Sequence, residues 1–230
     1  MKIGIISDIH GNSHGLKIVL SKLSKCDKTL CAGDISGYYP FVDESISLLK
    51  EHKVISVLGN HDQYLLEGKA PEGANPEVKK SVRFMKKIVS PSSLKYLFNL
   101  PINLKFKIKG KKILMCHGSP WDYLRGRIYP DFSNFKEFEQ VPFDVIILGQ
   151  THYPLVRKVG KKTIINPGSC GQPRDYNLLS YAIWDTNSNK VEIKRAAWDI
   201  GKFKKEALAR GTEQEFFGVF SRENKIYGKE

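Results

Sequence analysis

The chain has few cysteines, and they show no pairing pattern. They are Cys26, Cys31, Cys116 and Cys170, with no C-x-x-C spacing, and most of them lie in or beside apolar runs. This usage is typical of free buried thiols in a reducing compartment and not of a disulfide framework. Cys116 directly precedes His117, and alternation along a strand would turn these two side chains to opposite faces.

Membrane-spanning and export segments are also missing. No stretch approaches the roughly 20 apolar residues of a membrane helix. The chain starts at Met1-Lys2 and runs straight into a short apolar segment, which does not resemble a cleavable signal peptide. There is no internal repeat, low-complexity tract or linker. We therefore expect a cytoplasmic protein without a membrane partner.

Acidic residues are in deficit. The chain has 37 lysines and arginines against 24 acidic residues, a formal net charge of +13. Such a surface favours polyanionic partners, including nucleotides and nucleic acid. The basic residues are nevertheless spread along the chain, without an arginine-rich run or a recognisable nucleic-acid motif. We favour a solvated lysine-rich surface, and nucleic acid and a second copy of the chain stay open as partners.

The length and composition predict one domain. A chain of 230 residues with 41% hydrophobic content can bury a substantial core but is small for two domains. We therefore treat residues 1–230 as a single domain, with an extension from about 201 to 230. Its aromatic residues, Phe216, Phe217, Phe220 and Tyr227, are compatible with packing back on the domain, a subunit contact or a lid. Packing back is the default expectation.

Five blocks of polar residues follow short apolar runs. The runs lie at 2–7, 29–32, 54–58, 113–116 and 145–148, and they suit strands buried on both faces. The blocks are Asp8-Ile9-His10, Gly33-Asp34, Gly59-Asn60-His61-Asp62, His117 and Gly149-Gln150-Thr151-His152. Carboxylate, imidazole and amide groups are ligands of hard or borderline divalent cations. Two such cations about 4 Å apart activate a water and absorb phosphoryl charge, so the order of the blocks indicates a two-metal phosphoesterase site.

Periodicity predicts the remaining elements. Apolar residues at helical spacing follow the first two strands, and a helix is expected between Pro71 and Pro91. Turns at Gly110-Lys111, at Gly160-Lys161 and at 187–189 predict antiparallel hairpins in the second half.

These blocks together resemble the calcineurin-like metallophosphoesterases. The similarity is greatest to the small prokaryotic phosphodiesterases and the diadenosine-tetraphosphatase-like branch, and it extends through the segment 166–175. The resemblance implies an α/β fold, a four-layer α/β/β/α sandwich of two mixed sheets flanked by helices. It also implies two divalent ions, manganese before iron, zinc or nickel, and hydrolysis of phosphodiester or nucleotide pyrophosphate bonds in a phosphorylated small molecule.

The resemblance also implies a role for each polar residue of the blocks. Asp8, His10 and His152 would hold one ion, and Asn60 and His117 the other. Asp34 would bridge the two ions, and a hydroxide between them would attack phosphorus. His61 would protonate the leaving oxygen or stabilise its charge, with Asp62 supporting it from behind.

Gln150 departs from the family pattern. The family usually has Gly-His-x-His where this chain has Gly149-Gln150-Thr151-His152. The Gln150 amide oxygen can coordinate the second ion, but a neutral amide is a weaker donor to transition metals than imidazole. We therefore expect a weaker or more selective second site.

Other polar residues near the blocks have two interpretations each. Asn12 is expected either to contact a substrate phosphate or to cap the helix after it. Arg174 is expected either to bind phosphate or to pair with Asp175. His14 and His52 lie outside the blocks and are expected not to be ligands.

Two alternative functions stay open. Some proteins of this fold, such as a retromer subunit, are binding scaffolds without catalytic residues, although the presence of His61 favours an enzyme. The other alternative is a phosphatase limited to monoesters, including phosphoserine or phosphothreonine in proteins; the protein serine/threonine phosphatases have a block similar to Gly-Asp-x-x-Asp-Arg-Gly at the second position. Here that block reads Gly33-Asp34-Ile35-Ser36-Gly37-Tyr38, without the second acid and the arginine.

Overall fold

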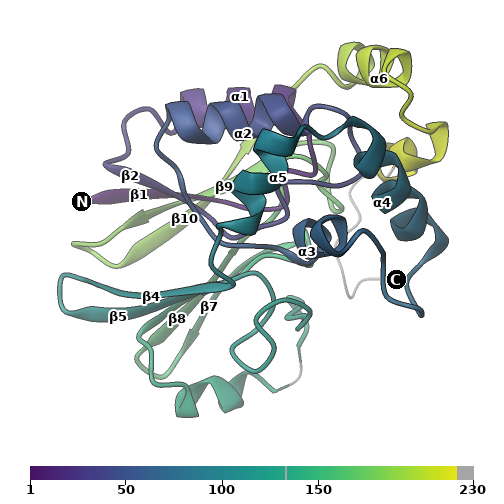
Figure 1. Ribbon diagram of the computed structural model, residues 1–230. Helices are drawn as coiled ribbons and strands as arrows, with labels where there is room; N and C mark the ends of the chain where they lie inside the picture. The colour runs from purple at the N-terminus through teal and green to yellow at the C-terminus, as the bar shows by residue number, and fades with distance from the viewer. Residues whose placement is uncertain (133, 222–230) are drawn as a thin grey trace.

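The computed structural model describes residues 1–132 and 134–221. Two five-stranded sheets lie face to face, and helices cover the outside (Figure 1). The strand order is β10-β9-β1-β2-β3 in the first sheet and β4-β5-β6-β8-β7 in the second. Both sheets mix parallel and antiparallel pairs. The predicted α/β class, with two mixed sheets flanked by helices, is confirmed.

The strands of the first sheet include the first three apolar runs. They are β1 (Lys2–Ile6), β2 (Lys28–Cys31), β3 (Ile55–Ser56), β9 (Leu179–Asp185) and β10 (Lys190–Ala196). β1, β2 and β3 run parallel, so their carboxyl ends lie at one edge of the sheet. β9 and β10 form the hairpin predicted at 187–189.

The second sheet carries the other two runs. Its strands are β4 (Asn103–Ile108), β5 (Lys111–Cys116), β6 (Val145–Ile147), β7 (Pro154–Val159) and β8 (Lys162–Pro167). β5, β6 and β8 run parallel, and the predicted hairpins β4–β5 and β7–β8 are both present.

Most of the helices occur in the first half of the sequence, in the segments that connect β1, β2, β3 and β4. They are α1 (Ser13–Lys22), α2 (Val42–Glu51), α3 (Asn60–Glu67), α4 (Pro76–Ile88), α5 (Pro91–Phe98) and α6 (Ile200–Ala209), with 3-10 helices η1 (Phe135–Gln140) and η2 (Gln214–Ser221). The predicted helix between Pro71 and Pro91 begins only at Pro76. Asn75 caps it by accepting a hydrogen bond from the Glu77 amide, and a proline suits the first helical position.

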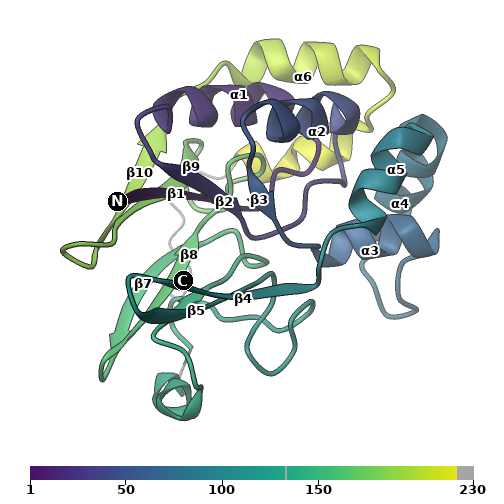
Figure 2. The ribbon, with the colours of Figure 1, turned by 60° about the vertical axis from the view of Figure 1, so that its left-hand side comes forward.

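The alternation of side chains along β1 explains its continuous apolar run. Ile3 and Ile5 pack between the sheets against Ile113 and Ile147 of the second sheet. Ile6 lies on the other face, in the core beneath α1 and α2. A strand with both faces covered has no position for a polar side chain. Figure 2 shows α1 and α2 above the first sheet and the second sheet below it.

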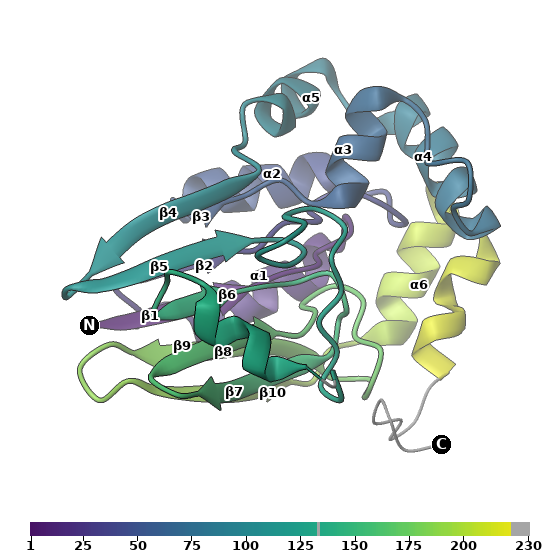
Figure 3. The same cartoon turned by 90° about the horizontal axis from the view of Figure 1, so that it is seen from below.

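The outer face of the second sheet is covered by residues 118–132 and 134–144, which include η1 (Figure 3). Phe138 of η1 is fully buried against apolar residues of β5 and β6 such as Leu114 and Ile146. This segment also passes close to the carboxyl ends of the strands.

The C-terminal extension packs back on the domain as far as it is described. Phe203 of α6 and Phe216 of η2 join Tyr39 and Phe41 in an aromatic cluster beside the loop after β2. Tyr227 lies outside the described residues. Within residues 1–132 and 134–221, no helix has the length and apolar character needed to cross a membrane.

Candidate metal centre

The candidate ligands lie on loops at the carboxyl ends of the parallel strands. The loops after β1 and β2 stay paired, since the Asp8 and His10 amides donate to the carbonyls of Gly33 and Asp34, both at 3.0 Å. Several ligand candidates have positive φ values, which are uncommon for residues other than glycine. These are Asp8 at 55°, His10 at 51°, Asp34 at 53°, Gln150 at 72° and His152 at 64°. Strained backbone of this kind concentrates at functional sites.

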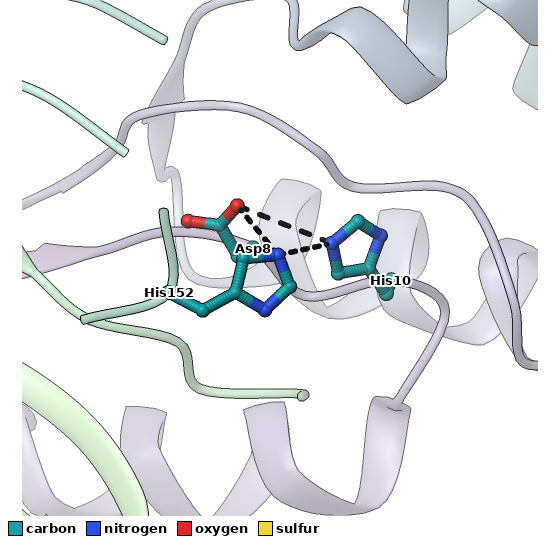
Figure 4. A group of neighbouring side chains, drawn as sticks. All are labelled: Asp8, His10 and His152. Atoms are coloured by element: carbon teal, nitrogen blue, oxygen red, sulfur yellow. Dashed lines mark hydrogen bonds and ion pairs between the residues drawn. The ribbon is translucent and has the colours of Figure 1, made fainter. Parts of the chain in front are cut away.

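Asp8, His10 and His152 form the first cluster (Figure 4). The Nε2 atom of His152 lies 3.3 Å from Asp8 Oδ1, and that of His10 lies 3.9 Å from the same oxygen. The two Nε2 atoms are 3.1 Å apart. All three side chains are buried, and the atoms that face one another are Asp8 Oδ1 and the two Nε2 atoms.

Asp34 joins this cluster to a second one. Its Oδ2 lies 3.6 Å from His10 Nε2 and 3.3 Å from His117 Nε2. Its Oδ1 accepts a hydrogen bond from the His61 amide at 2.9 Å, which holds the carboxylate in place. One oxygen of Asp34 therefore faces ligand candidates from both sheets.

The second cluster contains His117, Asn60 and Gln150. Asn60 Oδ1 lies 2.9 Å from His117 Nε2. The Gln150 amide nitrogen donates to the same Asn60 oxygen at 3.2 Å, and the Gln150 oxygen accepts from Arg127 Nε at 3.3 Å.

Backbone carbonyls orient all three imidazoles of these clusters. In each ring Nδ1 faces a carbonyl oxygen: His10 faces Ser36 at 3.1 Å, His117 faces Ala32 at 2.7 Å and His152 faces Gln172 at 2.6 Å. A carbonyl can only accept, so each Nδ1 carries a proton and each Nε2 is left for a ligand. Metal-binding histidines are typically held in this way.

The charges at the site fit divalent cations. Both Asp8 oxygens are buried without a hydrogen-bond partner among the described residues. Burial raises the pKa of Asp8 to about 7, although His117 opposes this, and burial lowers the pKa of His10 and His152 well below the usual value. Burial acts against a charged His117, yet Asp34 raises the pKa of His117, so positive charge is favoured where the two meet.

His61 and Asp62 are neighbours in the sequence, but their side chains have different surroundings. His61 lines a cavity beside the two clusters, with Nδ1 buried and without a hydrogen-bond partner in the described structure. Burial lowers the pKa of His61 to about 4, although Asp34 opposes the shift. Asp62 instead accepts hydrogen bonds from the backbone amides of Ile35, Ser36 and Gly59, and so ties α3 to the loop that carries Asp34.

Asn12 and Arg174 are placed differently from each other. Asn12 is fully buried; it accepts from the Gly15 amide as the cap of α1 and donates to the Gly171 carbonyl at 2.8 Å. Arg174 lines the same cavity as His61. Asp175 forms its ion pair with Arg195.

The cavity beside the clusters has a volume of about 590 Å³. Its walls include Asp34, Asn60, His61, Gln150 and His152, together with Arg125, Arg127, Arg174, Tyr38 and Tyr64. Sequence reasoning missed Arg125 and Arg127; two arginines soon after the His117 block were the available signal. A larger cavity of about 770 Å³ lies on the outside of α1 and α2. We assign the site to the smaller one because it contains the converging ligand candidates.

The two remaining histidines are outside the site. His14 forms an ion pair with Glu206 of α6 at 2.9 Å. His52 directly follows the C-terminal end of α2 and is exposed.

Comparison with known proteins identifies the family. A profile of the calcineurin-like phosphoesterase superfamily domain matches residues 1–189. An uncharacterized protein of Methanocaldococcus jannaschii is 34% identical, with 87% of this chain and 89% of that protein covered. Structurally, a metallophosphoesterase from Sphaerobacter thermophilus is similar with a TM-score of 0.82 and 27% identity, covering 96% of this chain and 98% of that one. A hypothetical protein from Pyrococcus horikoshii shares the fold with a TM-score of 0.87 and 22% identity, covering 98% and 99%. The chain belongs to the calcineurin-like phosphoesterase superfamily.

Proposed function

We propose that this protein hydrolyses phosphodiester or nucleotide pyrophosphate bonds at a dinuclear metal centre. Superfamily membership supports the broader description of a metal-dependent hydrolase acting on phosphoesters. The observation that carries the proposal is the convergence of three imidazole Nε2 atoms on the Asp8 and Asp34 carboxylates. Backbone carbonyls hold each imidazole with this atom turned inward.

The two clusters suggest how the ions would be held. Asp8, His10 and His152 would bind one ion, Asn60 and His117 the other, and the Asp34 carboxylate would be shared. Bound there, two divalent ions would supply an activated water nucleophile and neutralise phosphoryl charge. Manganese is the ion we propose first, and iron, zinc and nickel also suit these donors.

The chain's own residues would bind the substrate and assist the leaving group. His61 lines the cavity and would donate a proton or a hydrogen bond to the leaving oxygen. Arg174 and Arg125 line the same cavity, where a guanidinium can bind phosphate oxygens in a bidentate manner. The substrate would therefore be a phosphorylated small molecule or a nucleotide. The four free cysteines suit a reducing compartment, so we propose that the protein works in the cytoplasm.

A weakly catalytic phosphate-binding scaffold is the second candidate. It is favoured by Gln150, which stands where the family usually has histidine and which contacts Arg127. A scaffold would bind phosphate in the cavity without hydrolysing esters.

A comparison of two esters tests the proposal. Metal-stripped protein refilled with manganese is assayed with bis-p-nitrophenyl phosphate and p-nitrophenyl phosphate. We expect diester turnover, abolished by Asp34→Ala and reduced at least about 100-fold by His61→Ala. His61→Ala should keep the wild-type metal content, and His52→Ala should keep both activity and metal. Absence of turnover with every divalent ion, in folded protein, would favour the scaffold.

A further inference from the structure

Gln150 is held between two partners. It is 8% exposed and lies on the loop after β6 with a φ of 72°. Its Oε1 accepts from Arg127 Nε at 3.3 Å, and its Nε2 donates to Asn60 Oδ1 at 3.2 Å. The Asn60 oxygen in turn lies 2.9 Å from His117 Nε2. A polar chain therefore connects Arg127 at the cavity wall to the second cluster.

Arg127 determines which way the Gln150 amide points. A guanidinium has donors and no acceptor, so the amide oxygen must face it. Turning the amide over would set Nε2 against Arg127 Nε, a donor against a donor. It would also set Oε1 against Asn60 Oδ1, an acceptor against an acceptor. Both hydrogen bonds would be lost, and the cost of unmade hydrogen bonds is high in a buried position.

In the observed orientation the amide nitrogen of Gln150, and not its oxygen, faces the second cluster. An amide binds a cation through its oxygen, and here an N–H group faces the Asn60 oxygen. Gln150 therefore supports Asn60 from outside, while its oxygen stays with Arg127. The positive charge of Arg127 further disfavours a cation nearby.

We propose that Arg127 is a positioning residue that keeps Gln150 out of the coordination shell of the second ion. The inference rests on the dinuclear centre proposed above. The second site is then left with Asn60, His117 and a share of Asp34, whereas the first has Asp8, His10, His152 and the same shared carboxylate. Occupancy of the second site is consequently controlled by a residue that binds no metal.

Arg125 offers a matched control. It lines the same cavity, and its guanidinium carbon lies 5.6 Å from the centre of the Tyr64 ring. Arg125→Met removes the same charge from the cavity but leaves the Arg127–Gln150 hydrogen bond in place. A comparison with Arg127→Met therefore separates general electrostatic repulsion from orientation of the amide.

Manganese titration of the full-length, metal-stripped protein tests the inference. Calorimetry gives the affinity of each class of site, and elemental analysis gives the bound metal. We expect one tight and one weak site in the wild type. Arg127→Met should tighten the weaker site by about tenfold, because the Gln150 oxygen is then free to coordinate; loss of an outer partner of a true ligand changes metal affinity on the same scale in the opposite direction. The tight site should be unchanged, and Arg125→Met should have a much smaller effect on the weaker site.

A double-mutant cycle adds a second readout. If Arg127 acts through the amide, Arg127→Met should change the weaker site no more than Arg125→Met does when Gln150 is already alanine. Circular dichroism and a retained tight site show that each variant is folded, and Arg127→Leu replaces Arg127→Met if that variant fails to fold.

The possible failures are distinguishable. Equal tightening by Arg125→Met and Arg127→Met would overturn the inference in favour of charge alone, and an unchanged weaker site in Arg127→Met would overturn it outright. In both cases two ions still bind, so the proposed dinuclear centre stands. If no variant binds a second manganese ion, the dinuclear centre fails together with this inference.

Discussion

His10 and His152 face each other with their Nε2 atoms 3.1 Å apart, and their rings are stacked with the ring centres 4.8 Å apart. Each ring directs Nδ1 to a backbone carbonyl, so neither Nε2 carries the proton. Two lone pairs at this distance repel each other, and Asp8 Oδ1 adds negative charge beside them. A cation between these three groups would convert the repulsion into attraction.

Metal binding should therefore stabilise the fold. Manganese at 100 times its dissociation constant should stabilise the folded state by about 2.7 kcal/mol. For a chain of this size, the melting temperature should then rise by roughly 5–10 °C. Differential scanning fluorimetry of stripped protein, with and without manganese, measures the shift. If neither manganese nor a chelator changed the melting temperature, the interpretation of the two clusters as metal sites would be contradicted.

Replacing His10 should remove the first ion, whereas replacing His14 should not. His10 is buried among the ligand candidates, and His14 pairs with Glu206 on the outside. We expect His10→Ala to lose tight manganese binding, by at least about 100-fold in affinity, the upper end of the effect of removing a ligand's supporting partner. His14→Ala should bind as the wild type does. Equal manganese affinities for the two variants, measured by calorimetry, would refute the assignment.

Gly59 should not tolerate a side chain. Its φ of −100° is ordinary, so the backbone does not require glycine. A Cβ atom would however lie 2.1 Å from both the amide nitrogen and the Oδ1 of Asp34. Gly59→Ala should displace the Asp34 carboxylate, destabilise the fold by about 1–3 kcal/mol through overpacking, and weaken metal binding.

Gly218→Ala is the control for that change, because a Cβ there meets nothing within 4 Å. Urea unfolding gives the free energy of unfolding of both variants. Similar stability of Gly59→Ala and Gly218→Ala would show that the close approach of Gly59 to Asp34 is not required.

Tyr39 should connect the C-terminal segment to the metal centre. Its hydroxyl donates to the Phe216 carbonyl at 3.0 Å and accepts from Gln172 Nε2 at 3.2 Å. The Gln172 carbonyl holds His152 Nδ1. Tyr39→Phe should cost about 1 kcal/mol of stability. It should also weaken manganese binding, by less than the roughly tenfold lost when a direct partner of a ligand is removed.

Tyr181→Phe provides the comparison for Tyr39→Phe. Tyr181 lies on β9 and is buried in the hydrophobic core beneath α1, outside the candidate metal centre. Its manganese affinity should equal that of the wild type. A Tyr39→Phe protein with unchanged affinity would limit the role of this hydrogen-bond chain to folding.

The strands, the hairpins and the order of the candidate ligands could be predicted from the amino-acid sequence. Strands such as β1 are buried on both faces, so burial leaves a continuous apolar run and forces polar residues such as Asp8 to the loop beyond the strand end. The turns at Gly110 and Gly160 likewise produce local hairpins. These features depend on neighbours in the chain, and local pattern is enough to predict them.

The groups that surround each candidate ligand could not be predicted in this way, because they depend on how the chain folds. The carbonyls that orient His10, His117 and His152 lie 26, 85 and 20 residues away, and Arg127 meets Gln150 across 23 residues. Asp175 likewise pairs with Arg195, which lies 20 residues away. No periodicity records such contacts, because they join segments that are distant in the sequence and meet only in the folded chain. The direction of the Gln150 amide is therefore a property of the folded site.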